Sequence, residues 1–201
     1  MSEIMSKLGV SAPAPQAGAL SLPNLLTFGR IAAVPVVAGL LMWGGDWARW
    51  TALVLFIGAA VTDFFDGYLA RRWALTTTMG AFLDTTADKL LVAGTLIALV
   101  AVGRASPWVA AVIVGREMMV LGLRGVVAAG GQVMKPSVWG KLKANVQFVA
   151  IFLAIVRTSE PWGRLYPDEY VMLVAAVVTV LSGVEYLWRF WSALEGARDP
   201  S

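Results

Sequence analysis

Six long uncharged stretches constrain the fold of this chain more than any other feature of its sequence. They are residues 31–45, 50–62, 90–103, 105–115, 144–156 and 170–184. Each is shorter than the roughly 20 residues that a helix needs to cross the hydrocarbon core of a membrane. One interpretation is therefore a soluble bundle of six buried helices. However, the stretches follow one another with short links, and almost no polar face remains for any of them to present to water.

The composition favours a membrane protein instead. Hydrophobic residues make up 58% of the 201 residues and charged residues only 14%, and the mean hydropathy is +0.72, whereas soluble domains are about 45–50% apolar. We therefore predict an all-α fold, an integral membrane bundle of six transmembrane helices that extend into the charged flanks. Residues 1–20 are expected to form a flexible cytoplasmic tail, residues 21–195 a single domain and residues 196–201 a C-terminal tail.

If the six helices alternate in direction, the charges that interrupt them fall at one membrane face. These charges are Arg30, Asp63, Asp66, Asp84, Asp88, Lys89, Arg116, Glu117, Arg124, Lys141, Lys143, Glu185 and Arg189. Ionisable groups within spans normally point into a bundle or a water-filled cavity, so we expect a polar chamber here. Of the 16 lysines and arginines, the four toward the opposite face are Arg49, Arg104, Arg157 and Arg164. The positive-inside rule therefore places the chamber at the cytoplasmic face.

Four aspartates gather at the edges of two of these helices. Asp63 and Asp66 are spaced i, i+3, and Asp84 and Asp88 are spaced i, i+4, so each pair shares one helix face. So much negative charge in a partly desolvated site requires compensation, for which a divalent metal is the obvious candidate. The chain has neither histidine nor cysteine. An all-oxygen site suits Mg²⁺ or Mn²⁺, and Mg²⁺ usually shares its coordination with substrate phosphates.

The residues between the aspartates agree with a phosphorylated substrate. Gly67, Ala70 and Gly80 are small at positions where a bound group would approach the backbone, and Arg71 can pair with phosphate oxygens. Small residues also commonly line the interfaces between transmembrane helices. Their position among four aspartates favours contact with the substrate.

Residues 63–88 fit the pattern D-x2-D-G-x2-A-R-x8-G-x3-D-x3-D at every defined position. This segment resembles the CDP-alcohol phosphotransferase family. The resemblance implies a six-helix fold, a homodimer and a divalent metal, with the first three aspartates as metal ligands. It further implies that Gly67, Ala70, Arg71 and Gly80 contact the CDP moiety. The fourth aspartate, Asp88, would be the general base.

Three further segments resemble the phosphatidylglycerophosphate synthase group of that family. They are residues 23–30, residues 115–117 with Arg124, and residues 139–143 with Gln147. That group often has Pro-Val at residues 85–86 and Thr at residue 144, where this chain has Thr-Thr and Ala. The resemblance implies transfer of the phosphatidyl group from CDP-diacylglycerol to sn-glycerol 3-phosphate, with release of CMP, at the bacterial inner membrane. We expect no nucleic-acid partner.

The acceptor in that reaction contains a phosphate of its own, so the chamber should contain further cations. The expected ligands of this phosphate are Arg116, Arg124, Lys141 and Lys143. Alternatively, each of these residues only sets the orientation of the helices in the membrane, according to the positive-inside rule. Asn24 and Thr27 either line the nucleotide pocket or only cap and anchor the first helix.

Three alternatives to this interpretation stay open. Within the same fold, the acceptor could be inositol phosphate, serine or phosphatidylglycerol. Intramembrane prenyltransferases also bind diphosphate through aspartates and Mg²⁺, although they are usually longer and lack the Gly-x2-Ala-Arg segment. A divalent-cation carrier could use the same carboxylates, but it has no need of Arg71, Arg116 and Lys141 beside them.

Overall fold

The described part of the chain consists of α-helices joined by loops. The computed structural model describes the backbone of residues 22–73, 78–129, 138–158 and 160–196, and the side chains of residues 25–62, 83–128, 139–158 and 160–192. Its helices are α2 (Leu22–Trp43), α3 (Asp46–Trp73), α4 (Thr78–Ala101), α5 (Pro107–Ala129), α6 (Val138–Val156) and α7 (Pro167–Gly196). For the described residues, the predicted all-α fold with six helices is confirmed. The predicted division into one domain and two tails stays a prediction.

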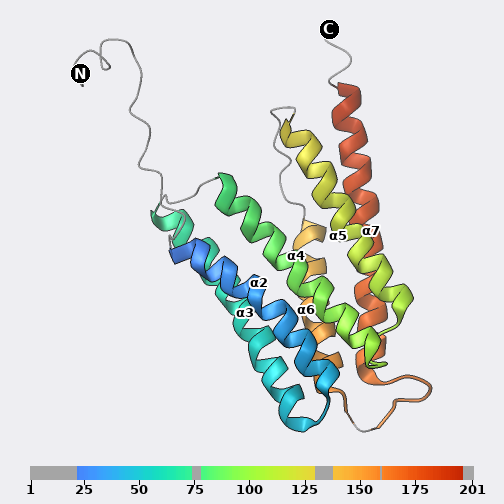
Figure 1. Ribbon diagram of the computed structural model, residues 1–201. Helices are drawn as coiled ribbons and strands as arrows, with labels where there is room; N and C mark the ends of the chain where they lie inside the picture. Colours follow the sequence, from blue (N-terminus) through green and yellow to red (C-terminus); the bar gives the residue numbers. More distant parts are fainter. Residues whose placement is uncertain (1–21, 74–77, 130–137, 159, 197–201) are drawn as a thin grey trace, which may run out of the picture.

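Successive helices run in opposite directions along the bundle (Figure 1). The starts of α2, α4 and α6 and the ends of α3, α5 and α7 therefore lie at one end, which we call the polar end. At the opposite, far end, α2 turns into α3 through Gly44 and Gly45, whose φ angles are 81° and 82°. Glycine adopts this left-handed conformation without steric cost, which permits so short a turn.

The bundle has an apolar core and an apolar exterior. Helix α2 packs against α3 and α4, and α7 packs against α5 and α6. The core contains Leu91, Leu96 and Ile113, all fully buried. Large apolar side chains such as Val54 and Val126 nevertheless face outward, and they are more than 60% exposed. Exposed apolar surface on this scale is typical of a protein that contacts lipid rather than water.

Three helices contain segments that are long and apolar enough to cross a membrane. These segments are Leu25–Trp43 in α2, Trp139–Val156 in α6 and Pro167–Ser192 in α7. Helices α4 and α5 are interrupted by charged residues, among them Lys89 and Glu117. The described residues therefore support a membrane protein with three candidate spans, while six transmembrane helices stay a prediction.

A cluster of charges fixes the loops at the far end. The Arg157 guanidinium lies 2.9 Å from the Asp168 carboxylate and 3.1 Å from that of Glu169, and it donates a hydrogen bond to the Gly103 carbonyl at 3.2 Å. It also lies 4.4 Å from the centre of the Tyr166 ring. These contacts join the loop between α4 and α5 to the loop between α6 and α7. They fix the ends of α4 and α6 and the start of α7 relative to one another at the far end.

Candidate functional site

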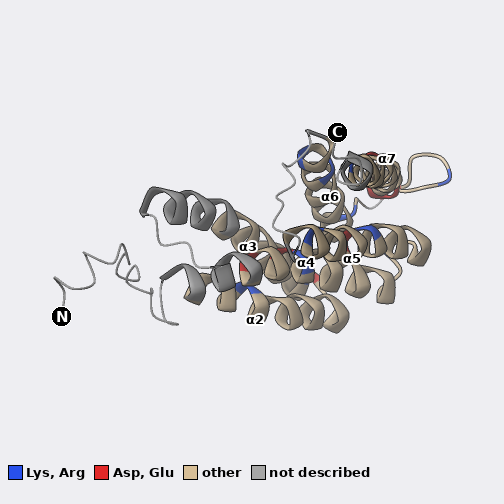
Figure 2. Cartoon of the chain, turned by 90° about the horizontal axis from the view of Figure 1, so that it is seen from above, with Lys and Arg blue, Asp and Glu red and all other residues tan. Residues whose placement is uncertain are grey.

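Charged side chains gather inside the bundle at the polar end. Seen from above, lysines, arginines and acidic residues cluster around α4 and α5, near the middle of the bundle (Figure 2). Arg30, Glu117 and Lys143 are all buried. Because a buried charge is strongly unfavourable unless it is paired, the contacts among these groups define the site.

The first contact joins α2 to the start of α4. Arg30 donates a hydrogen bond from Nη1 to Asp84 Oδ1 at 3.0 Å. The Asp84 side chain is 36% exposed, and Arg30 is its only partner among the side chains that the structure describes. Among the described side chains, none is within hydrogen-bond distance of the second carboxylate oxygen of Asp84. Thr27, also buried, lies one turn before Arg30 on α2.

The second contact extends from α4 to α5. Asp88 lies one turn after Asp84, and its Oδ2 accepts a hydrogen bond from Lys89 Nζ at 2.7 Å. The same ammonium group lies 3.2 Å from Glu117 Oε2. Lys89 is thus shared between two carboxylates on neighbouring helices.

Glu117 forms the centre of a cluster of cations. It is 3% exposed, and Lys143 on α6 pairs with its Oε1. Arg116 Nη1 lies 3.5 Å from the same oxygen, and Lys89 approaches the other. Arg116 also donates a hydrogen bond to Ser182 Oγ on α7 at 2.7 Å. We call Lys89, Arg116, Glu117 and Lys143 the Glu117 cluster.

A cavity of about 140 Å³, which we call the cationic pocket, opens beside this cluster. The cations that line it are Lys89, Arg116, Arg124, Lys141 and Lys143. Among the described residues of its lining, Glu117 is the one carboxylate. Five cations against one carboxylate give an excess of positive charge that favours a phosphate or a similar anion. The structure thus brings together all four cations predicted to bind the acceptor phosphate.

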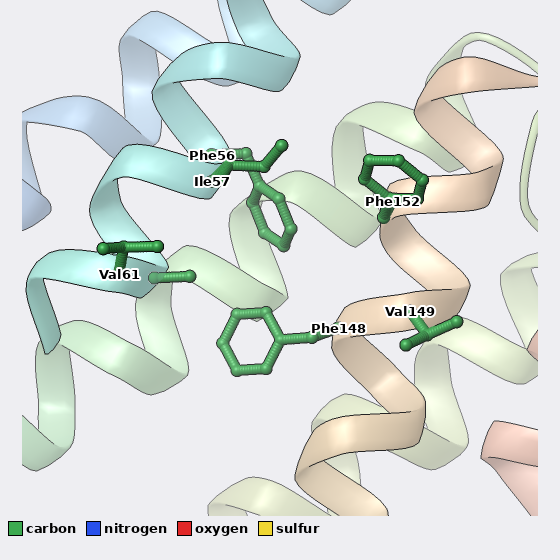
Figure 3. Close-up of a pocket in the computed structure, with 7 residues that line it drawn as sticks. Phe56, Ile57, Val61, Phe148, Val149 and Phe152 are labelled. Carbon is green, nitrogen blue, oxygen red and sulfur yellow. The ribbon is translucent and has the colours of Figure 1, made fainter. Parts of the chain in front are cut away.

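An apolar groove of about 380 Å³ lies between α3 and α6. Its lining consists of Phe56, Ile57, Ala60 and Val61 on α3 with Phe148, Val149 and Phe152 on α6. Figure 3 shows Phe56 and Phe148 reaching toward each other across the groove, and their ring centres are 5.6 Å apart. On α3 the described lining reaches Val61, two residues before Asp63. Its size and lining suit a hydrocarbon chain.

Several predicted site residues lie outside the described side chains. They are Asn24, Asp63, Asp66, Gly67, Ala70, Arg71 and Gly80. The backbone places Asp63 and Asp66 in the last part of α3 and Asp84 and Asp88 in the first part of α4, as predicted. Among the described side chains, no three acidic residues converge on one point. The predicted metal site and its ligands therefore stay predictions.

The sequence predicted no binding role for Lys89, Glu117 and Tyr186, although all three line the cationic pocket. It placed Lys89 and Glu117 at the polar face only as charges that interrupt the helices. Tyr186 lies in the apolar helix α7 and fills no position of a recognised motif, so the sequence contains no signal for it.

Comparison of the sequence with known proteins identifies the family of this chain. The model of the CDP-alcohol phosphatidyltransferase family matches residues 20–182. The CDP-diacylglycerol--glycerol-3-phosphate 3-phosphatidyltransferase of Bacillus subtilis is 38% identical over 87% of this chain and 97% of the relative. A probable phosphatidylglycerophosphate synthase of Mycobacterium tuberculosis is 40% identical over 89% of this chain and 86% of the relative. A cardiolipin synthase (CMP-forming) of Oryza sativa is 35% identical over 87% of this chain and 59% of the relative. This chain belongs to the CDP-alcohol phosphatidyltransferase family.

Proposed function

We propose that this enzyme transfers the phosphatidyl group from CDP-diacylglycerol to sn-glycerol 3-phosphate, forming phosphatidylglycerophosphate and CMP. The main support is the cationic pocket, which lies beside the first turns of α4 and contains five cations. An acceptor that bears a phosphate is complementary to such a pocket. Relatives from several organisms bear the name of this reaction.

A divalent metal fits the donor half of the site. Members of this family generally use divalent metals, and carboxylate oxygens are the ligands that Mg²⁺ and Mn²⁺ prefer. We assign Asp63, Asp66 and Asp84 as ligands, the last through the oxygen that Arg30 leaves available. When bound, the metal neutralises the diphosphate of the donor and stabilises the negative charge that develops on CMP.

The remaining donor contacts follow from the family pattern and from the surface of the bundle. We assign the nucleotide to Asn24, Thr27, Gly67, Ala70, Arg71 and Gly80. The apolar groove between α3 and α6 is the seat of one acyl chain of the donor, because its lining includes Val61, two residues before Asp63 on the same helix. An acyl chain in this groove would place the diphosphate next to the four aspartates.

The acceptor reacts between the two halves of the site. Arg116, Arg124, Lys141 and Lys143 bind its phosphate, which holds the 1-hydroxyl near Asp88. The Asp88 carboxylate accepts the proton of that hydroxyl, and the oxygen attacks the β-phosphorus of the donor. The bond between this phosphorus and the oxygen of CMP then breaks. The link from Asp88 through Lys89 to Glu117 supports a base that is adjacent to the acceptor pocket.

The membrane arrangement follows the same assignment. We propose a homodimer in the bacterial inner membrane, with six transmembrane helices and the polar end facing the cytoplasm. The distribution of lysine and arginine supports this orientation. At the far end, Trp43, Trp47 and Trp108 are strongly exposed, as expected for side chains at the opposite interface.

A second acceptor is favoured by one observation. The similarity to a cardiolipin synthase from rice makes phosphatidylglycerol the main alternative to glycerol 3-phosphate. The test is CMP release by the purified protein from CDP-diacylglycerol and Mg²⁺, with glycerol 3-phosphate, phosphatidylglycerol, inositol phosphate, serine or glycerol as acceptor. We expect the highest kcat/KM with glycerol 3-phosphate and phosphatidylglycerophosphate as the product in mass spectrometry. A higher kcat/KM with any other acceptor would refute the assignment.

A further inference from the structure

The hydroxyl group of Tyr186 is buried and has no hydrogen-bond partner among the described residues. This α7 residue is 6% exposed, and its hydroxyl makes no hydrogen bond to any group that the structure describes. Buried polar groups in folded proteins are nearly always hydrogen-bonded, because an unpaired one costs free energy. An unpaired hydroxyl in a binding pocket is therefore a candidate contact for a ligand.

The surroundings of Tyr186 identify the kind of ligand. Its side chain lines the cationic pocket together with Arg124, Lys141 and Lys143. The Arg124 guanidinium lies 5.8 Å from the centre of the Tyr186 ring, a distance at which a cation is attracted to an aromatic face. An anion with several oxygen atoms can therefore accept hydrogen bonds from these cations and from the phenol hydroxyl together.

The neighbouring contact on α7 places Tyr186 at the same wall of the pocket. Ser182 precedes Tyr186 by four residues, so the two side chains share one face of the helix. Ser182 Oγ accepts a hydrogen bond from Arg116 at 2.7 Å. Helix α7 thus orients one cation of the pocket through Ser182 and presents an unpaired donor one turn later.

We propose that Tyr186 determines acceptor specificity by donating a hydrogen bond from its hydroxyl to the phosphate group of the acceptor. This inference rests on the proposed function, because it assumes an acceptor with a phosphate. A phosphate oxygen supplies the partner that the buried hydroxyl lacks. An acceptor without a phosphate leaves the hydroxyl unpaired and gains nothing from it.

The substitution Tyr186→Phe removes only this hydroxyl group. We expect the KM for glycerol 3-phosphate to rise at least about tenfold, as for the loss of a hydrogen bond to a charged group. The kcat and the KM for CDP-diacylglycerol should not change, because the contact is equal in the ground and transition states. The melting temperature should stay the same or rise, because the free protein loses no hydrogen bond.

Tyr170→Phe is the matched control. The Tyr170 hydroxyl donates a hydrogen bond to the Trp162 carbonyl at 3.0 Å, at the far end of the bundle. Its removal should leave both KM values unchanged. For Tyr186→Phe, an unchanged KM for glycerol 3-phosphate would overturn the proposal, whether or not the melting temperature falls.

Calorimetric titration with inorganic phosphate separates this inference from the proposed function. We expect the affinity of Tyr186→Phe for phosphate to fall by a factor similar to the rise in KM. If the wild-type protein does not use glycerol 3-phosphate but Tyr186→Phe still binds phosphate more weakly, the proposed function fails and the phosphate contact is supported. Equal phosphate affinities of the wild type and the variant would overturn the contact itself.

Discussion

Replacing Glu117 by glutamine would test whether the cationic pocket binds the acceptor through its excess positive charge. Glu117 pairs with Lys143, lies 3.2 Å from Lys89 and lies 3.5 Å from Arg116. A bound phosphate competes with this carboxylate for the same cations. Glutamine has nearly the same size but no charge, so the cations would interact more strongly with the phosphate. We therefore expect Glu117→Gln to bind the acceptor more tightly.

The magnitude follows from Coulomb's law. Two unit charges 4 Å apart interact by about 4 kcal/mol at an effective dielectric constant of about 20, and the energy falls inversely with distance. A phosphate bound beyond the side chains that contact Glu117 would lie about twice as far from its carboxylate, so the repulsion would be about half of this value, about 2 kcal/mol. Its removal corresponds to about a 30-fold gain in affinity. Lys143, which is buried, would meanwhile lose its carboxylate partner, which lowers stability by about 3–5 kcal/mol.

The assay is competitive inhibition of CMP release by inorganic phosphate at saturating CDP-diacylglycerol, together with thermal unfolding in detergent. For Glu117→Gln we expect an inhibition constant about 30-fold lower and a lower melting temperature. Glu169→Gln is the control, because it removes the same charge from a pair with Arg157 at 3.1 Å at the far end of the bundle. A folded Glu117→Gln protein that binds phosphate more weakly than the wild type would refute the argument, since the cations would then need Glu117 to form the site.

Three further predictions concern the metal, the base and the acyl chain. A chelator should abolish activity and Mg²⁺ or Mn²⁺ should restore it, so full CMP release in excess chelator would contradict the metal assignment. Asp88→Asn should lower kcat by about 10²- to 10⁴-fold while binding of CDP-diacylglycerol, measured by calorimetry with metal present, is retained. Ala60→Trp should raise the KM for long-chain CDP-diacylglycerol about tenfold by filling the groove, whereas Val54→Trp, outside the groove lining, should not. Equal KM values for these two variants would argue against the groove as the acyl site.

The sequence predicted the local arrangement of the site well. The uncharged stretches indicated six helices because a long apolar run between charges is a local property. The same reasoning placed Asp84 and Asp88 one turn apart at the start of α4, which the structure confirms. It also placed Arg116 and Lys143 at the same end, because consecutive spans joined by short loops run in opposite directions.

Contacts between helices could not be predicted in the same way. Glu117 pairs with Lys89 and Lys143, which lie 28 residues before it and 26 residues after it. Such contacts depend on the rotation of α4, α5 and α6 about their axes. Apolar residues surround each of these helices, so no amphipathic pattern reveals that rotation. The burial of the Tyr186 hydroxyl depends on the same packing.

The proposed reaction requires that the polar end hold the metal-bound donor beside the cationic pocket. The most direct test is an experimental structure with Mn²⁺ and CDP-diacylglycerol, in which anomalous scattering locates the metal. We predict an anomalous peak within coordination distance of the Asp84 carboxylate, in contact with the donor diphosphate. A metal-bound diphosphate at the far end, near Arg49, Arg104 and Arg157, with no peak at Asp84, would contradict the account.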